Sequence, residues 1–164
     1  MIILYMTNYI KRSMCKEYMT KVVAISGGFD PMHIGHVRMI QEAAALAGEG
    51  GRLVVILNND NWLRAKKGYV FMPEAERKEV LLAVKGVDEV LLTKHEEDPQ
   101  DMSVGDALEA LGPDVFANGG DRKKEEDDIP VREYEIARHK GIALVFNVGR
   151  GGKVQSSSEL VNTQ

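Results

Sequence analysis

The stretch KVVAISGGFDPMHIGH, residues 21–36, joins a short apolar run to the start of a helical one through a glycine-containing turn. Residues 22–25 are apolar and mostly β-branched, which is typical of a strand buried on both faces. After Gly27 and Gly28, apolar residues recur at helical spacing over residues 34–47. This strand, turn and helix predict the first β–α unit of a parallel sheet.

The same alternation continues along the chain. Further apolar runs and helical stretches span residues 53–57, 73–84, 89–92, 104–111, 114–117, 129–139 and 142–148, with a last short helix from Ser156. Runs that are apolar throughout indicate parallel strands covered by helices on both faces. We therefore predict an α/β fold: a single doubly wound, Rossmann-like domain over residues 21–164 with about five parallel strands. In such sheets ligands bind beyond the carboxyl ends of the strands, in the β→α loops.

Composition limits the function classes. The chain has 164 residues and a net charge of −4, which does not suggest a general nucleic-acid or anionic-membrane binder. Residues 1–20 are predicted to be an N-terminal extension, because the apolar run at residues 1–6 is too short for a membrane span and lacks the flanking charges of a secretory signal. Cys15 is the only cysteine, which excludes an intrachain disulfide and fits the reducing cytoplasm.

The first β→α loop has the residue types of a phosphate site. Gly27 and Gly28 let the backbone approach a ligand, and the positive end of the following helix attracts an anion. His33 and His36 lie three apart at that helix start, so both are expected to face the same anion, and Gly35 between them leaves the entry open. The alternative is a capped helix start with two structural histidines, but the complete motif favours a phosphate site.

Three later segments fall on the same side of the predicted sheet. A basic loop at residues 58–69 carries Lys66 and Lys67. A glycine turn at residues 118–122 follows the fourth strand, and small hydroxyls at residues 156–158 start the last helix, where they suit both capping and phosphate binding.

The segment His-Ile-Gly-His at residues 33–36, together with these motifs, resembles the signature of the HIGH-motif nucleotidylyltransferase superfamily. Within it the chain is similar to the cytidylyltransferase-like group, which includes glycerol-3-phosphate cytidylyltransferase and the nucleotidylyltransferase domain of ADP-heptose synthase. The resemblance runs from about Lys21 to Val161. Gln155 departs from it, since an aliphatic residue is usual there, and three serines replace the usual Ser-Thr-Thr.

The resemblance implies roles for individual residues. His33, His36 and either Lys66 or Lys67 would be catalytic. Arg77 and Arg150 would contact the substrate, with Lys153 an alternative to Arg150, and an exposed Arg77 paired with Glu74 the alternative to a contact. The residues implied to bind the nucleotide are Gly27, Gly28, Phe29, Asp30, Gly35, Gly119, Asp121, Ser156, Ser157 and Ser158.

The implied reaction is nucleotidyl transfer. A phosphorylated sugar or polyol would attack the α-phosphorus of CTP or ATP, and pyrophosphate would leave. Mg²⁺ would accompany the triphosphate, with Asp30 orienting the loop or touching the metal through water. The alternatives are an adenylyltransferase acting on pantetheine phosphate, NMN or FMN, and a non-catalytic nucleotide-binding module. Members of the family commonly form homodimers, and neither nucleic acid nor membrane is an expected partner.

Overall fold

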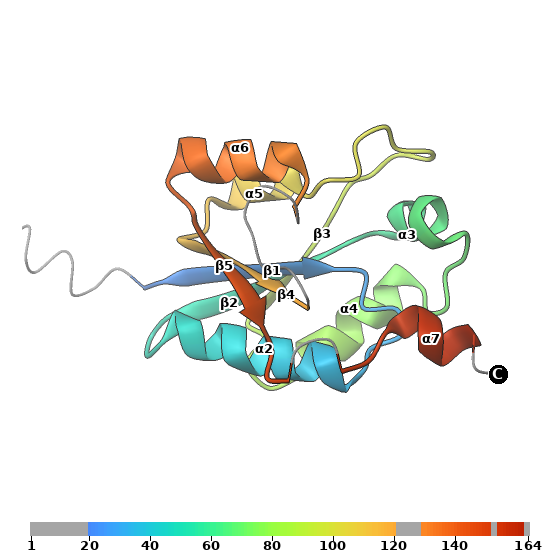
Figure 1. The fold of residues 1–164 in the computed structure, drawn as a ribbon, viewed down its shortest axis with the longest axis horizontal. Helices are drawn as coiled ribbons and strands as arrows, with labels where there is room; N and C mark the ends of the chain where they lie inside the picture. Colours follow the sequence, from blue (N-terminus) through green and yellow to red (C-terminus); the bar gives the residue numbers. More distant parts are fainter. Residues whose placement is uncertain (1–19, 121–128, 152–153, 163–164) are drawn as a thin grey trace, which may run out of the picture.

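The computed structural model describes residues 20–120, 129–151 and 154–162. Its centre is an all-parallel sheet in the order β3-β2-β1-β4-β5, covered by helices on both faces (Figure 1). The strands are β1 (Val22–Gly27), β2 (Arg52–Leu57), β3 (Glu89–Leu92), β4 (Val115–Gly119) and β5 (Ala143–Val148). The helices are α2 (Ile34–Ala47), α3 (Asp60–Lys67), α4 (Glu74–Leu82), α5 (Gly105–Leu111), α6 (Val131–Lys140) and α7 (Ser157–Asn162). The predicted doubly wound α/β fold is confirmed.

The two faces of the sheet bury two apolar clusters. Val23 and Ile25 of β1 pack with α2 and α4 on one face, whereas Ala24 packs with α5 and α6 on the other. Figure 1 shows this division, with α5 and α6 above the sheet and α2 and α4 below it. Because both faces are covered, the strands are apolar at successive positions. The strand order reverses beside β1, whose neighbours are β2 and β4, and a ligand site is expected there.

Helix α3 corrects the sequence interpretation, which treated residues 58–69 as a loop. Its N-cap is Asn59, whose side chain accepts a hydrogen bond from Trp62 N at 3.0 Å, and it ends at Gly68 in the left-handed conformation with φ 81°. Leu63 is its one buried residue, so the apolar periodicity is too sparse to predict a helix. Asn59 and Gly68 were the available signal, since each is a residue type favoured at its end of a helix.

Some expectations fall outside the described residues: the extension up to residue 19, Asp121 and Lys153. Within the described part, none of the helices has the length and hydropathy needed to cross a membrane.

Candidate active site

The histidine cavity, as we name it, lies beyond the carboxyl ends of β1, β4 and β5 and has a volume of about 260 Å³. Its lining combines residues from the first β→α loop, the first turn of α2, the end of β4 and the segment after β5. The lining residues are Ser26, Gly27, His33, Gly35, His36, Met39, Asn118, Gly119, Gly120, Val148, Gly149, Val154 and Gln155. Five predicted site residues therefore meet here: Gly27, His33, Gly35, His36 and Gly119.

The two histidines form the start of α2. His33 is the N-cap, and its Nδ1 accepts a hydrogen bond from Gly35 N at 3.1 Å. His36 reaches back so that its Nδ1 accepts from His33 N at 3.3 Å. The two rings stack with centroids 3.8 Å apart, and Phe29 lies against the ring of His36 at 4.8 Å. Two histidines thus replace the side chains of an ordinary capping box.

This geometry selects the tautomer of both rings. Each Nδ1 accepts a backbone hydrogen bond, so the proton of a neutral ring is on Nε2. Burial, the neighbouring His33 and the charge of Lys67 lower the pKa of His36 to about 3. Burial, followed by the charge of Lys67, also lowers the pKa of His33. Both histidines are therefore neutral Nε2–H donors near neutral pH.

Glycines keep the first loop close to its neighbours. A Cβ atom at Gly35 would lie 3.0 Å from the ring of His33, and one at Gly28 would lie 2.8 Å from the side chain of Leu63. At the end of β4, a Cβ atom at Gly119 would lie 2.3 Å from the sulfur of Met39. Side chains at these positions would displace His33, Leu63 and Met39.

Asp30 is fully buried and orients the loop. Its carboxylate accepts hydrogen bonds from Phe71 N at 2.8 Å and Met72 N at 2.7 Å. Both oxygens are therefore occupied by backbone donors, and the preceding Phe29 is buried with φ 50°. This arrangement fits the expected loop-orienting role of Asp30 better than a contact to a metal. No group of three or more His, Cys, Asp or Glu suited to a metal occurs among the described residues.

The structure distinguishes the two lysines. Lys67 is half-buried, and its Nζ donates to the carbonyl of Asp30 at 3.0 Å. Its charge lowers the pKa of both histidines, and burial of its own ammonium lowers the pKa of Lys67. Lys66 is exposed on the outer side of α3. Lys67 is therefore the lysine that the fold brings close to the histidines.

Arg77 is placed differently from both sequence interpretations. Its side chain is 0% exposed and forms an ion pair with Asp60 at 2.6 Å. Its remaining hydrogen bonds go to the carbonyls of Gly28 at 2.7 Å, Asn58 at 2.7 Å and Met72 at 2.8 Å. The guanidinium thus joins the first loop, the start of α3 and the segment before α4. It lies in the protein interior and does not line the histidine cavity.

The predicted serines pack beside the first loop. Ser157 is buried and donates to the carbonyl of Pro31 at 2.8 Å, whereas the Oγ of Ser156 accepts from Glu159 N at 3.4 Å and so caps α7. Ser158 is half-buried and Arg150 is exposed. None of these four lines the cavity as described, but Gln155 does. The departure from the family pattern at Gln155 was the sequence signal for this missed lining residue.

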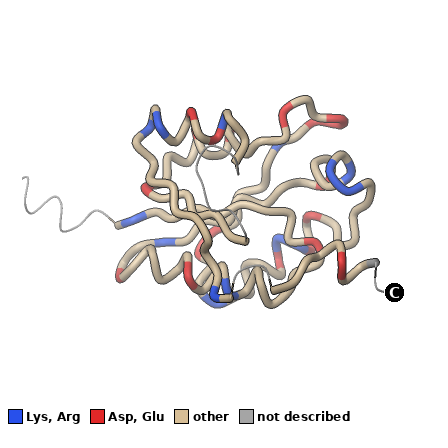
Figure 2. Tube along the Cα trace, viewed as in Figure 1, with Lys and Arg blue, Asp and Glu red and all other residues tan. Residues whose placement is uncertain are grey.

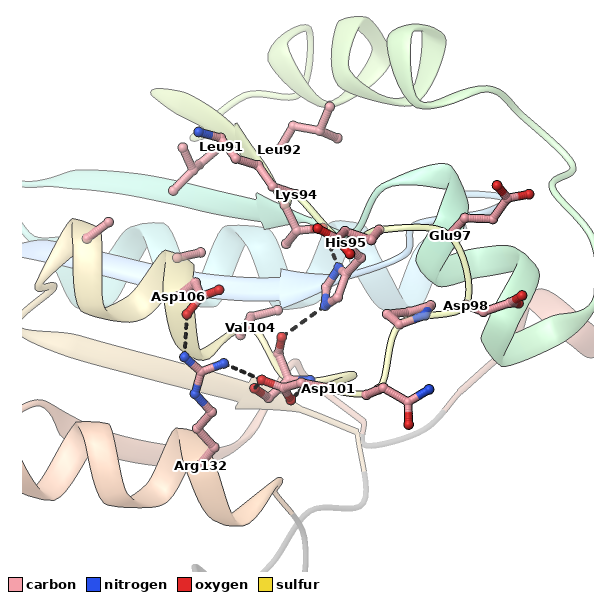
Figure 3. Close-up of a pocket in the computed structure, with 17 residues that line it drawn as sticks. Leu91, Leu92, Lys94, His95, Glu97, Asp98, Asp101, Val104, Asp106 and Arg132 are labelled. Atoms are coloured by element: carbon pink, nitrogen blue, oxygen red, sulfur yellow. Dashed lines mark hydrogen bonds and ion pairs between the residues drawn. The ribbon is translucent and has the colours of Figure 1, made fainter.

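A second cavity was not anticipated from the sequence. The β3–α5 cavity, with a volume of about 640 Å³, is formed by β3, the segment 93–103, α5 and Arg132 (Figure 3). Arg132 forms ion pairs with Asp101 and Asp106 along its wall. His95 Nδ1 lies 2.9 Å from Thr93 Oγ1, and its Nε2 lies 3.0 Å from the carbonyl of Ser103. The two cavities share no lining residue.

Comparison with known proteins identifies the family. The model of the cytidylyltransferase-like family matches residues 24–145. The chain is a member of the cytidylyltransferase-like family. As the resemblance implied, this member of the cytidylyltransferase-like family is a nucleotidyltransferase.

Relatives of this cytidylyltransferase-like chain include FAD synthases and HldE proteins. It is 35% identical over 148 residues to a FAD synthase of Methanothermobacter marburgensis. That alignment covers 90% of this chain and 84% of the relative. It is 40% identical over 127 residues to the bifunctional protein HldE of Citrifermentans bemidjiense. That alignment covers 76% of this chain and 24% of HldE. Among solved structures, a lipopolysaccharide core biosynthesis protein from Thermoplasma volcanium shares the fold, with a TM-score of 0.59, 24% identity, and coverage of 79% of this chain and 96% of the other.

Proposed function

We propose that this chain transfers AMP from ATP to the phosphate of FMN and releases FAD and pyrophosphate. The observation that carries the transfer is the histidine pair, two neutral Nε2–H donors at the start of α2 with Lys67 nearby. FMN, one of the alternative acceptors from the sequence, is favoured by the FAD synthase relative, which aligns over most of both chains. FAD consists of FMN and AMP joined through their phosphates, so its formation requires this transfer.

The reaction needs no side-chain nucleophile. An oxygen of the FMN phosphate attacks the α-phosphorus of ATP, and the bond from that phosphorus to the bridging oxygen of the leaving pyrophosphate breaks. Negative charge grows on the phosphate oxygens during transfer, where hydrogen bonds from the Nε2–H groups of His33 and His36 stabilise it. The ammonium of Lys67 and the N-terminus of α2 add positive potential.

Mg²⁺ would accompany the triphosphate and supply partial neutralisation of its charge. Both oxygens of Asp30 accept backbone N–H groups, so phosphate oxygens and water would be the ligands expected for the ion. Asp30 contributes by holding the loop that carries the histidines.

A second candidate is transfer of a nucleotidyl group to a sugar phosphate. It is favoured by the HldE relative, whose aligned segment is a minor part of that protein. The same histidine pair would serve, since the attacking group is again a phosphate.

Pyrophosphate release with Mg²⁺ tests these alternatives. ATP and CTP are each combined with FMN, heptose 1-phosphate and glycerol 3-phosphate, and the product is identified by mass. We expect release with ATP and FMN, and one FAD for each pyrophosphate. Release with a sugar or polyol phosphate alone would support the second candidate, and nucleotide binding without release would indicate a non-catalytic module.

A further inference from the structure

We infer that the β3–α5 cavity binds the flavin ring of the acceptor, while the phosphate of the same molecule reaches the histidine cavity. The identity of the ring rests on the proposed function. The location rests on the lining, charge and position of the cavity.

The lining suits a flat ring with one apolar and one polar edge. Apolar side chains come from β3 and α5, namely Leu91, Leu92, Val104, Ala107 and Ala110. His95 also lines the cavity, with both ring nitrogens already in hydrogen bonds to Thr93 and Ser103 (Figure 3). Such a wall is fixed before a ligand arrives, which lowers the entropic cost of binding.

The charge of the lining excludes a phosphate. Five carboxylates face two basic side chains: Glu96, Glu97, Asp98, Asp101 and Asp106 against Lys94 and Arg132. Figure 2 shows acidic residues over the segment 96–98 and basic residues on α3. A triphosphate or the phosphate of FMN would be repelled from this cavity, whereas an uncharged ring would not.

Trp62 lies beside both the first loop and the segment that closes the β3–α5 cavity. Its Nε1 donates to the carbonyl of Met102 at 2.8 Å, on the segment that closes the β3–α5 cavity. Its ring lies 3.6 Å from where a Cβ atom of Gly28 would be, in the first loop. In this arrangement the ribityl chain of FMN would pass beside Trp62.

Size assigns the two rings of the product. The β3–α5 cavity, at about 640 Å³, is larger than the histidine cavity, at about 260 Å³. The tricyclic flavin therefore suits the former, and the smaller bicyclic adenine suits the latter.

Trp62 is the only tryptophan, and its Nε1 bonds the segment that closes the cavity, so its fluorescence is the probe of that segment. Riboflavin, which has the ring and ribityl chain but no phosphate, is titrated against the protein, and quenching of Trp62 fluorescence is followed. We expect saturable quenching that adenosine does not reverse. Absence of quenching in a protein that forms FAD, or reversal by adenosine, would overturn the inference.

Ala110→Phe fills the cavity from an exposed position on α5, and Ala45→Phe makes the same change on an exposed position of α2. We expect Ala110→Phe to weaken riboflavin binding and raise the KM for FMN by about tenfold or more, with the KM for ATP unchanged. Ala45→Phe should behave as wild type. Thermal unfolding of both variants checks that they fold.

The titration separates the inference from the proposed function because it requires no turnover. If Ala110→Phe weakens riboflavin binding and Ala45→Phe does not, the flavin site is supported. This holds even if no FAD is formed, an outcome that would contradict the proposed function. Equal binding by wild type and Ala110→Phe overturns the site even if FAD is formed.

Discussion

His33 and His36 act through a fixed tautomer. Their Nδ1 atoms accept backbone N–H groups, so the helix start itself presents both Nε2–H groups as donors. Burial, His33 and Lys67 hold the pKa of His36 near 3, which removes it from acid–base chemistry at neutral pH. The pair is thus a preorganised hydrogen-bond donor to a phosphate.

The depressed pKa of His36 predicts how stability depends on pH. The unfolded chain protonates His36 near its ordinary pKa of 6.5, whereas the folded protein does so near 3. Its contribution to stability is therefore complete above pH 6.5 and is lost as the pH falls towards 3, by at most about 1.4 kcal/mol per pH unit. We expect urea unfolding at about pH 7 and about pH 5 to show a smaller loss for His36→Gln than for wild type. Gln retains a side chain suited to the capping box, and equal losses would contradict the account.

Lys67 and Lys66 form a matched pair of neighbours. Lys67→Met removes the ammonium beside the histidines, and we expect kcat for nucleotidyl transfer to fall by about tenfold to a hundredfold. Lys66→Met removes an exposed charge and should leave kcat within about twofold of wild type. Steady-state pyrophosphate release measures both, and a reversed order would place the active lysine at Lys66.

At the scale of elements, buried charges hold the loops of the site together. Arg77 on α4 joins the first loop to the start of α3, and Asp30 joins the first loop to the segment before α4. Lys67, at the far end of α3, then reaches the carbonyl of Asp30. The position of α3, and with it that of Lys67, follows from these contacts.

Arg77→Met would leave the Asp60 carboxylate and three carbonyls without their partner. We expect it to lower the free energy of unfolding by about 3–5 kcal/mol, as measured by urea unfolding. Lys78→Met, on the exposed side of the same helix, should change it by less than about 0.5 kcal/mol. A stable Arg77→Met variant in which only KM is raised would instead support the substrate contact of Arg77 that the sequence predicted.

The sequence predicted elements better than it predicted partners. The strands were recognisable because each contains at least three consecutive apolar residues, and α2 because its apolar residues recur at helical spacing. Helix α3 was not predicted because it buries only Leu63. The burial of Arg77 was not predicted because its acceptors are backbone carbonyls distant in the sequence, which a local residue pattern does not indicate.

At the scale of the whole molecule, the order of the strands decides which loops meet. The reversal beside β1 brings the ends of β4 and β5 to the histidine loop, which places Gly119 and Gln155 in one cavity. Gly119 could be proposed from its motif, but its close approach to Met39 depends on helix packing that only the folded chain shows. The β3–α5 cavity likewise has no sequence signature, since its walls come from separate elements.

The family model matches residues 24–145, so we expect residues 1–18 to be dispensable. A chain that starts at Met19 should keep the urea midpoint and the transfer rate of the full chain. Loss of either would show that the extension belongs to the domain.

The most direct measurement is pyrophosphate release from ATP and FMN by wild type, His36→Ala and His139→Ala. His139 is exposed on α6 and controls for loss of an imidazole. We expect His36→Ala to lower kcat by about a hundredfold or more, with its fold intact by circular dichroism, and His139→Ala to match wild type. Wild-type turnover by a folded His36→Ala variant would contradict the account.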